Sequence, residues 1–291
     1  METTELLKKV RKIEIKTRGL ANQIFSGEYH SVFKGRGMSF SEVREYQIGD
    51  DVRSIDWNVT ARFNHPYVKI FEEERELTVM LLVDVSGSGN FGTAVQMKKD
   101  LAIELCAVLA FSAIQNNDKV GVIFFSDVIE KFIPPKKGRT HILRIVRELL
   151  DFKPLHNKTN IAEVLRYLTS VIKKRSIAFV ISDFMDTGFE DALKISSKKH
   201  DVVAIRLYDR REQEIPAVGL MRLFDAETGE VILIDSSKKS VGDNYSKWFR
   251  QKEENHKSIF RKSAVDSINI RTDQSYVQPL MNFFRIREKR W

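Results

Sequence analysis

The stretch Leu77-Thr-Val-Met-Leu-Leu-Val-Asp-Val-Ser-Gly-Ser-Gly-Asn90 decides the fold of this chain. Its first half, up to Val85, is short and almost fully apolar apart from Asp84, which predicts a buried parallel strand. An oxygen-rich loop follows, and then a long helical pattern from Ala94 to Ala113. Open α/β sheets bind ligands beyond the carboxyl ends of their strands. The carboxylate of Asp84 and the hydroxyls of Ser86 and Ser88 suit a hard cation such as Mg²⁺.

Two later segments offer oxygen ligands at equivalent places. Thr159 lies in Asn157-Lys-Thr-Asn, just before the helical pattern Ile161 to Ile172, and Asp183 ends the apolar strand that starts at Ile177. The carboxyl ends of parallel strands lie on one edge of a sheet, so these groups are expected to converge. Asp and Ser are also common turn formers, and a plain turn is the alternative. In this order, Asp84, Ser86, Ser88, Thr159 and Asp183 resemble the metal-ion-dependent adhesion site of von Willebrand factor A domains.

The order of elements predicts the architecture. A basic helix is expected at Thr3 to Asn22, a short strand at Glu28 to Lys34 and a polar loop at Gly35 to Arg62. An edge strand is expected at Tyr67 to Glu72. After Leu77, strands and helices alternate, which predicts a mostly parallel sheet with helices on both faces. Further elements are expected at Lys119–Ser126, Thr140–Leu150, Phe189–Lys199, Asp201–Leu207, Asn244–Ala264 and Tyr276–Glu288.

The C-terminal third carries a hairpin signal. Met221–Phe224 and Glu230–Ile234 flank a turn with Gly229. The predicted fold is therefore an α/β, Rossmann-like domain with a C-terminal hairpin and an N-terminal β/loop extension, and the resemblance above implies that the domain is von Willebrand factor A-like. We place the extension, including the first helix, at residues 1–75 and the α/β domain at residues 76–291.

Composition limits the class of protein. The 291 residues are 42% hydrophobic, enough for a real core. No apolar stretch reaches the roughly 18–20 residues that span a bilayer, and Met1 to Lys9 lacks a signal-type apolar region. The single cysteine, Cys106, lies in an apolar helical pattern and is expected in the core. A cytoplasmic protein is expected.

The net charge of +8 raises the alternative of a nucleic-acid-binding protein. Acidic residues lie among most of the basic clusters, and no nucleic-acid motif accompanies them. Solvated helix faces explain these clusters better, and no nucleic acid is expected as a partner. They lie at Lys8–Arg18, Lys136–Arg139, Lys173–Arg175, Lys198–Lys199 and Arg285–Arg290.

The segment before the first sheet strand carries a family resemblance. It reads Gly35-Arg-Gly-Met-Ser-Phe-Ser-Glu-Val-Arg-Glu-Tyr-Gln-Ile-Gly-Asp-Asp-Val-Arg-Ser-Ile-Asp-Trp-Asn-Val-Thr-Ala-Arg62. Followed by the Asp84 motif, it resembles the bacterial family called domain of unknown function 58. The resemblance implies a von Willebrand factor A-like domain and a MoxR-type AAA+ ATPase as a functional neighbour. No enzymatic activity is established for that family in general.

The same segment is rich in charges of both signs. Its basic members face its acidic members in sequence, and they form either an ion-pair network or a recognition surface. Trp57 is expected to be an anchor packed beneath the loop. The charged residues are Arg36, Glu42, Arg44, Asp50, Asp51, Arg53, Asp56 and Arg62.

The resemblance to the adhesion-type site implies a role. Ser86, Ser88 and Thr159 would supply hydroxyl ligands to Mg²⁺, with Mn²⁺ or Ca²⁺ as alternatives, and Asp84 and Asp183 would balance the charge. A carboxylate of a partner, either a MoxR-type ATPase or its client, would fill the open position. Lys158 would compete with the cation if its ammonium pointed inward.

An enzyme is the rival class. Mg²⁺ held at a strand end can support phosphoryl transfer. A haloacid-dehalogenase-like phosphatase would need a second Asp where Ser86 stands, and the chain has no Gly-x-x-x-x-Gly-Lys phosphate loop. A metal-dependent, non-enzymatic interaction module is therefore the preferred prediction, ahead of a phosphoryl-transfer hydrolase.

Overall fold

The computed structural model describes residues 3–25, 38–73, 77–92 and 96–289. The chain divides into two compact units, with the smaller one inside residues 33–77. The larger unit combines the N-terminal helix with the chain from Thr78 onward. The predicted strand at Glu28 to Lys34 lies outside the described residues.

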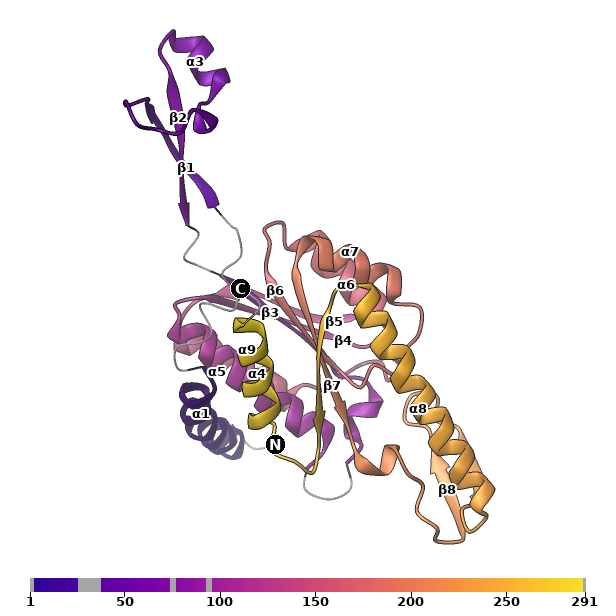
Figure 1. Cartoon of the computed structure of the whole chain (residues 1–291). Coiled ribbons are helices and arrows are strands. Elements are labelled where there is room, and N and C mark those ends of the chain that lie inside the picture. The colour runs from indigo at the N-terminus through magenta and orange to yellow at the C-terminus, as the bar shows by residue number, and fades with distance from the viewer. Residues whose placement is uncertain (1–2, 26–37, 74–76, 93–95, 290–291) are drawn as a thin grey trace. The chain divides into compact units, whose positions relative to one another are not determined.

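A six-stranded sheet forms the centre of the larger unit (Figure 1). Five strands are parallel, and only β5, at one edge, runs antiparallel to its neighbour. The strand order β10-β7-β6-β3-β4-β5 is that of a doubly wound α/β fold, which confirms the predicted fold class. The strands are β3 (Thr78–Asp84), β4 (Lys119–Phe125), β5 (Ile129–Lys136), β6 (Ile177–Ser182), β7 (Asp201–Tyr208) and β10 (Asp266–Arg271).

The sequence prediction missed both edge strands, for a physical reason. β5 contains Pro134 and Pro135, which suit only an edge position because proline has no amide hydrogen to donate. β10 is short, and only Ile268 and Ile270 of its residues are buried. Edge strands bury one face at most, so they lack the continuous apolar run of the central strands.

Helices cover both faces of the sheet (Figure 1). On one face, α6, α7 and the C-terminal part of α8 pack on inward side chains of β3 and β6, such as Leu82 and Val180. The other face carries α4, α5 and α9, with α1 packed outside them. The helices are α1 (Thr3–Phe25), α4 (Lys98–Gln115), α5 (Arg139–Asp151), α6 (Ile161–Val171), α7 (Glu190–Lys199), α8 (Lys239–Lys262) and α9 (Val277–Glu288).

The position of α1 corrects the predicted domain division. The sequence predicts this helix as part of the extension, but it belongs to the larger unit and packs on α4, where Lys16 Nζ lies 2.6 Å from a Glu104 carboxylate oxygen. α4 is apolar on nearly all sides, since it lies between the sheet and α1. Its Cys106 is fully buried, as predicted, and burial raises the pKa of the thiol well above its usual value.

The smaller unit is more ordered than the polar loop that was predicted. β1 (Met38–Glu45) pairs antiparallel with β2 (Tyr67–Glu73), the predicted edge strand. Between them lie the short η1 turn (Val52–Ser54) and helix α3 (Trp57–Phe63). The helix was missed because it has only seven residues, too few to show a helical period.

The predicted C-terminal hairpin is confirmed, with strands β8 (Leu220–Phe224) and β9 (Val231–Asp235). A short 3-10 turn, η3 (Arg210–Glu212), precedes it. Across the described ranges, no helix is both long and apolar enough to cross a membrane.

Candidate functional site

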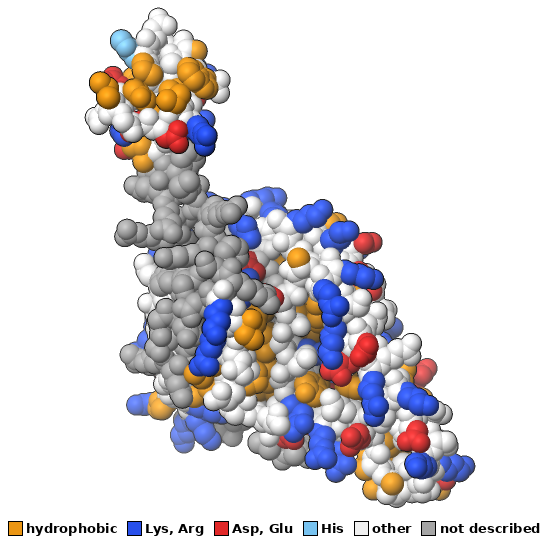
Figure 2. Space-filling view, viewed as in Figure 1, with side chains coloured by type: hydrophobic (Ala, Val, Ile, Leu, Met, Phe, Trp, Pro, Cys, Tyr) orange, Lys and Arg blue, Asp and Glu red, His pale blue; other side chains and the backbone are white. Residues whose placement is uncertain are grey.

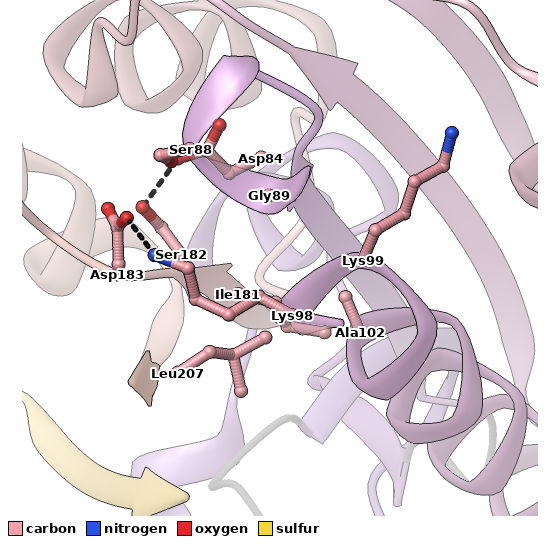
Figure 3. Close-up of a pocket in the computed structure, with 10 residues that line it drawn as sticks. All are labelled: Asp84, Ser88, Gly89, Lys98, Lys99, Ala102, Ile181, Ser182, Asp183 and Leu207. Carbon is pink, nitrogen blue, oxygen red and sulfur yellow. Dashed lines mark hydrogen bonds and ion pairs between the residues drawn. The ribbon is translucent and has the colours of Figure 1, made fainter. Parts of the chain in front are cut away.

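The predicted site lies at the carboxyl ends of two neighbouring strands (Figure 3). Asp84 is the last residue of β3, and Asp183 directly follows β6. Ser86 and Ser88 lie in the turn after β3, which continues as the 3-10 segment η2 (Gly87–Asn90). Because β3 and β6 pair in parallel, the sheet itself brings the two carboxylates to one edge, as the sequence predicted.

Hydrogen bonds fix the Asp84 carboxylate from both sides. One oxygen accepts from the Ser86 amide at 3.0 Å, and the other accepts from the Ser182 hydroxyl at 2.6 Å. The hydroxyl oxygens of Ser86 and Ser88 lie 3.1 Å apart. Burial, with the nearby Asp183 carboxylate, raises the pKa of Asp84 to about 7, and the bonds from Ser182 and Ser86 oppose this. The orienting role of Ser182 was not foreseen, although Ser182 immediately precedes Asp183.

A lysine lies inside the site. Lys98, the first residue of α4, has only 3% of its surface exposed. Its ammonium lies 2.7 Å from Asp183 and 2.6 Å from Glu212 of η3. Burial raises the pKa of Asp183, but the Lys98 ammonium, with hydrogen bonds from the Met185 amide and Ser88, outweighs this and holds that pKa below its usual value. The positive side chain that would compete with a bound metal ion is therefore Lys98. Lys158, the predicted competitor, is exposed at the surface.

Thr159 reaches the site from a separate loop. The carbonyl of Asn157 accepts from the Gly87 amide at 2.9 Å, which joins this loop to the serine turn. The next residue, Asn160, caps α6 through its side chain, so Thr159 lies just before the helix. Its hydroxyl donates to the Glu227 carboxylate at 3.0 Å.

Glu227 is a site residue that sequence reasoning missed. It lies at the tip of the β8–β9 hairpin, 68 positions after Thr159. Burial, together with the carboxylates of Asp183, Asp225 and Asp186, raises its pKa. The hairpin was predicted, but no local pattern in the sequence predicts that its tip contacts the loop of Thr159.

The donor set matches a hard cation in type. The carboxylates of Asp84 and Asp183 and the side chain of Ser88 border a cavity of about 20 Å³. The Ser86 hydroxyl lies beside that of Ser88, and Thr159 lies on the adjoining loop. Oxygen ligands of this kind are what Mg²⁺ takes, usually with several waters retained. In the described parts of the chain, no cluster of three His, Cys, Asp or Glu residues is placed to hold a metal, so the hydroxyls would be essential. Lys98 already balances Asp183, and a cation would share or displace that ion pair.

The charged segment of the smaller unit is partly an ion-pair network. Arg44 forms a two-pronged pair with Asp50 at 2.8 and 2.7 Å, and Lys69 lies 3.3 Å from Asp56. Asp51 and Asp56 also cap η1 and α3 through backbone amides. Glu42, Arg53 and Arg62 are exposed. Arg36 lies outside the described residues.

The prediction for Trp57 is wrong. Its side chain is 67% exposed and anchors nothing beneath the loop. Trp57 is the first residue of α3 and directly follows the capping residue Asp56. At this position its side chain points toward solvent. Ile48, Val52 and Phe63 are exposed in the same unit, and Figure 2 shows hydrophobic side chains gathered on its surface.

The sheet order and the oxygen-rich site between β3 and β6 define a von Willebrand factor A-like α/β protein. Within that class, the chain belongs to the family described as "Protein of unknown function DUF58", which matches residues 42–255. The match covers both the charged segment from Glu42 onward and the whole candidate site.

Two mycobacterial relatives match the chain, one of them over nearly its full length. The chain is 28% identical over 292 residues to "Uncharacterized protein Rv1480" of Mycobacterium tuberculosis, covering 99% of this chain and 92% of that protein. It is 24% identical to "Uncharacterized protein MAV169" of Mycobacterium avium, over 54% of this chain and 94% of that protein.

Solved structures resemble the chain at low identity. The conserved hypothetical protein BatB from Bacteroides thetaiotaomicron has a TM-score of 0.48 at 19% identity, covering 73% of this chain and 99% of that one. The SpRpn10 VWA domain has a TM-score of 0.41 at 8% identity, and the match covers 72% of this chain and 95% of that domain.

Proposed function

We propose that this protein is a non-enzymatic interaction module that recognises an acidic side chain of a partner protein at the sheet-edge site. One observation carries the proposal: Asp84 and Asp183, from neighbouring strands, border one small cavity together with the hydroxyl of Ser88. A divalent cation, Mg²⁺ in the first instance and Mn²⁺ or Ca²⁺ as alternatives, would be held there by Asp84, Ser86, Ser88, Thr159 and Asp183.

The chemistry of the site favours an anionic ligand. A bound cation would add positive charge beside the ammonium of Lys98, which is already buried in the site. A carboxylate from a partner would complete the cation's coordination and offset that charge. When bound, the cation would supply only this electrostatic link, and the residues of the chain would orient it.

Binding fits the site better than catalysis does. Both oxygens of Asp84 already accept hydrogen bonds, from Ser86 and Ser182, so this carboxylate is held in place rather than free to attack. A nucleophile also needs an adjacent acid or base, and the residue two positions on is Ser86. We therefore propose no enzymatic activity.

The partner is proposed from the family. Membership in the DUF58 family supports a MoxR-type AAA+ ATPase, or a client of such an ATPase, as the protein that presents the carboxylate. A cytoplasmic location is part of the same proposal.

Calorimetry with a MoxR-type ATPase from the same organism tests the proposal. The wild-type protein is titrated with the ATPase, once in Mg²⁺ and once in EDTA. The variants Asp84→Ala and Asp191→Ala are titrated in the same way, and Asp191→Ala is the control because it removes an exposed carboxylate of α7. Binding that needs both Mg²⁺ and Asp84, but not Asp191, is expected. Equal binding in all conditions would place the contact elsewhere, and no binding would remove the ATPase as partner.

A further inference from the structure

We propose that Glu227 is an internal ligand of the sheet-edge site, and that the β8–β9 hairpin thereby keeps the site closed to partners. This inference rests on the proposed function, because it assigns the position of the partner's carboxylate to a residue of the same chain. A partner would have to displace Glu227 in order to bind.

The first observation is the contact itself. The Glu227 carboxylate accepts from the hydroxyl of Thr159 at 3.0 Å, so an acidic side chain already engages one of the predicted ligands. It is half-buried, and the charge of Asp183 acts on it. A carboxylate beside other carboxylates is repelled unless a cation or a donor lies between them. A cation held by the Thr159 hydroxyl would therefore lie beside the Glu227 carboxylate.

The second observation is the close approach of the hairpin backbone to the serine turn. A Cβ atom added at Gly87 would lie 2.4 Å from the carbonyl oxygen of Ala226, the residue before Glu227. Only glycine permits this approach, since any side chain would push the hairpin tip away. The glycine between Ser86 and Ser88 therefore lets the hairpin rest directly on the candidate site.

The tip is built to present Glu227 in one orientation. The Asp225 carboxylate accepts from the Glu227 amide at 2.9 Å and from the Thr228 hydroxyl at 2.8 Å. Gly229, with φ of +77°, closes the turn through its amide to the Asp225 carbonyl. Such side-chain-capped turns are rigid, so Glu227 loses little conformational freedom when it engages Thr159.

The remainder of the hairpin is suited to moving as a unit. Among the described residues, β8 and β9 pair only with each other and form a separate two-stranded sheet. Leu220, Phe224 and Leu233, on one face of that sheet, are exposed. In the described residues, no sheet hydrogen bonds with a third strand therefore hold the hairpin down against the domain. The Ser236 hydroxyl ties its two ends together at Gly219 and Val218, which provides a base for the movement.

Competition of this kind has a measurable size. A partner that binds only the open form sees its affinity reduced by the fraction of molecules that are open. If the hairpin is closed in about nine-tenths of the molecules, its release tightens partner binding about tenfold. Removing the internal carboxylate also removes a charged ligand from the cation, which weakens the binding of Mg²⁺ alone.

Two calorimetric titrations test the inference with Glu227→Ala, the conservative variant Glu227→Gln and the control Glu230→Ala. Glu230 lies in the same turn region but is exposed. With Mg²⁺ alone, Glu227→Ala is expected to bind about tenfold more weakly than wild type, with Glu227→Gln in between. With the MoxR-type ATPase at saturating Mg²⁺, the same variant is expected to bind about tenfold more tightly. Glu230→Ala should match the wild type in both titrations.

The outcomes separate this inference from the proposed function. Mg²⁺-dependent ATPase binding that is the same in wild type and Glu227→Ala would overturn the internal ligand and leave the proposed function standing. A weaker Mg²⁺ affinity in Glu227→Ala, without ATPase binding by any form, would support the internal ligand and remove the ATPase. Unchanged or absent Mg²⁺ binding in both wild type and Glu227→Ala would overturn the inference.

Discussion

The ammonium of Lys98 lies 2.7 Å from the carboxylate of Asp183, with both side chains buried. Lys98 begins α4 and Asp183 directly follows β6, so the ion pair joins the start of a helix to the end of a strand across the candidate site. The site thus contains its own positive charge.

Replacing Lys98 by methionine should lower the free energy of unfolding, because the buried carboxylates around it would lose their positive partner. Asp183 and Glu212 would lose their shared partner, and breaking a buried pair of this kind costs about 3–5 kcal/mol of unfolding free energy. Mg²⁺ should recover part of this loss in the variant and stabilise it more than the wild type. Denaturant unfolding with Mg²⁺ and with EDTA measures both effects.

The matched control is Lys16→Met, which removes the half-exposed pair with Glu104. An exposed pair contributes at most about 1 kcal/mol, and its loss should not depend on Mg²⁺. Equal stabilisation of Lys98→Met and wild type by Mg²⁺ would show that the cation does not compete with Lys98.

Replacing the two site carboxylates by amides should change the free energy of unfolding in opposite directions. The pKa of Asp84 is about 7 in the folded protein, well above 3.8, so the folded state favours its protonated form. Asp84 therefore lowers stability as pH rises from about 4 through 7, by up to about 4 kcal/mol. In EDTA at pH 8, Asp84→Asn should be more stable than the wild type, and this advantage should shrink toward pH 5.

Asp183→Asn should show the opposite sign. Its pKa is held below the usual value by Lys98, so its charged form stabilises the fold above the unfolded-state pKa, and this stability is lost as pH falls through the folded pKa. The variant should be less stable than the wild type at pH 8. Thermal or denaturant unfolding at the two pH values measures both variants. A lower stability of Asp84→Asn at pH 8 would contradict the assigned pKa.

Phe184 turns the chain directly after Asp183 in a left-handed backbone conformation, with φ of +58°. The ring is fully buried and packs on Phe260 at a centroid distance of 5.2 Å. Phe184→Ala should cost about 3–5 kcal/mol through the lost ring. Phe184→Gly should be about 1 kcal/mol more stable than Phe184→Ala, because glycine adopts this conformation without strain.

Phe179 is the control for that ranking. It is equally buried but lies inside β6, where the backbone is extended. There the glycine variant should be less stable than the alanine variant, since glycine loses more backbone freedom on folding. The same ranking at both positions would argue against strain at Phe184.

The stability of helix α3 in the smaller unit should depend on the side chain of Asp56 and not on that of Trp57. The Asp56 side chain accepts from the amides of Asn58 and Val59 and so caps α3. Asp56→Ala should speed the hydrogen exchange of α3 amides, whereas Trp57→Ala should leave it unchanged because that ring is exposed. Exchange measured by mass spectrometry checks both, and faster exchange in Trp57→Ala would restore the anchor role.

Much of the central architecture could be predicted because it depends on local patterns. The apolar runs at β3 and β6 identify buried strands, and parallel strands must end on one edge, so Asp84 and Asp183 had to meet. The edge strands β5 and β10 were missed because a strand buried on one side lacks such a run. The exposure of Trp57 depends on how seven residues of α3 lie against β2, which no period reveals.

The sequence by itself determined the central parallel strands, the C-terminal hairpin and the positions of the oxygen-bearing residues that follow β3 and β6, since each depends on the residues of one strand or hairpin and its adjoining loop. The tertiary structure alone decided that Lys98 balances Asp183 and that Glu227 reaches Thr159. These pairs are separated by 85 and 68 positions. Their meeting depends on how α4 and the hairpin pack against the sheet edge, and contacts between distant segments leave no periodic signal in the chain.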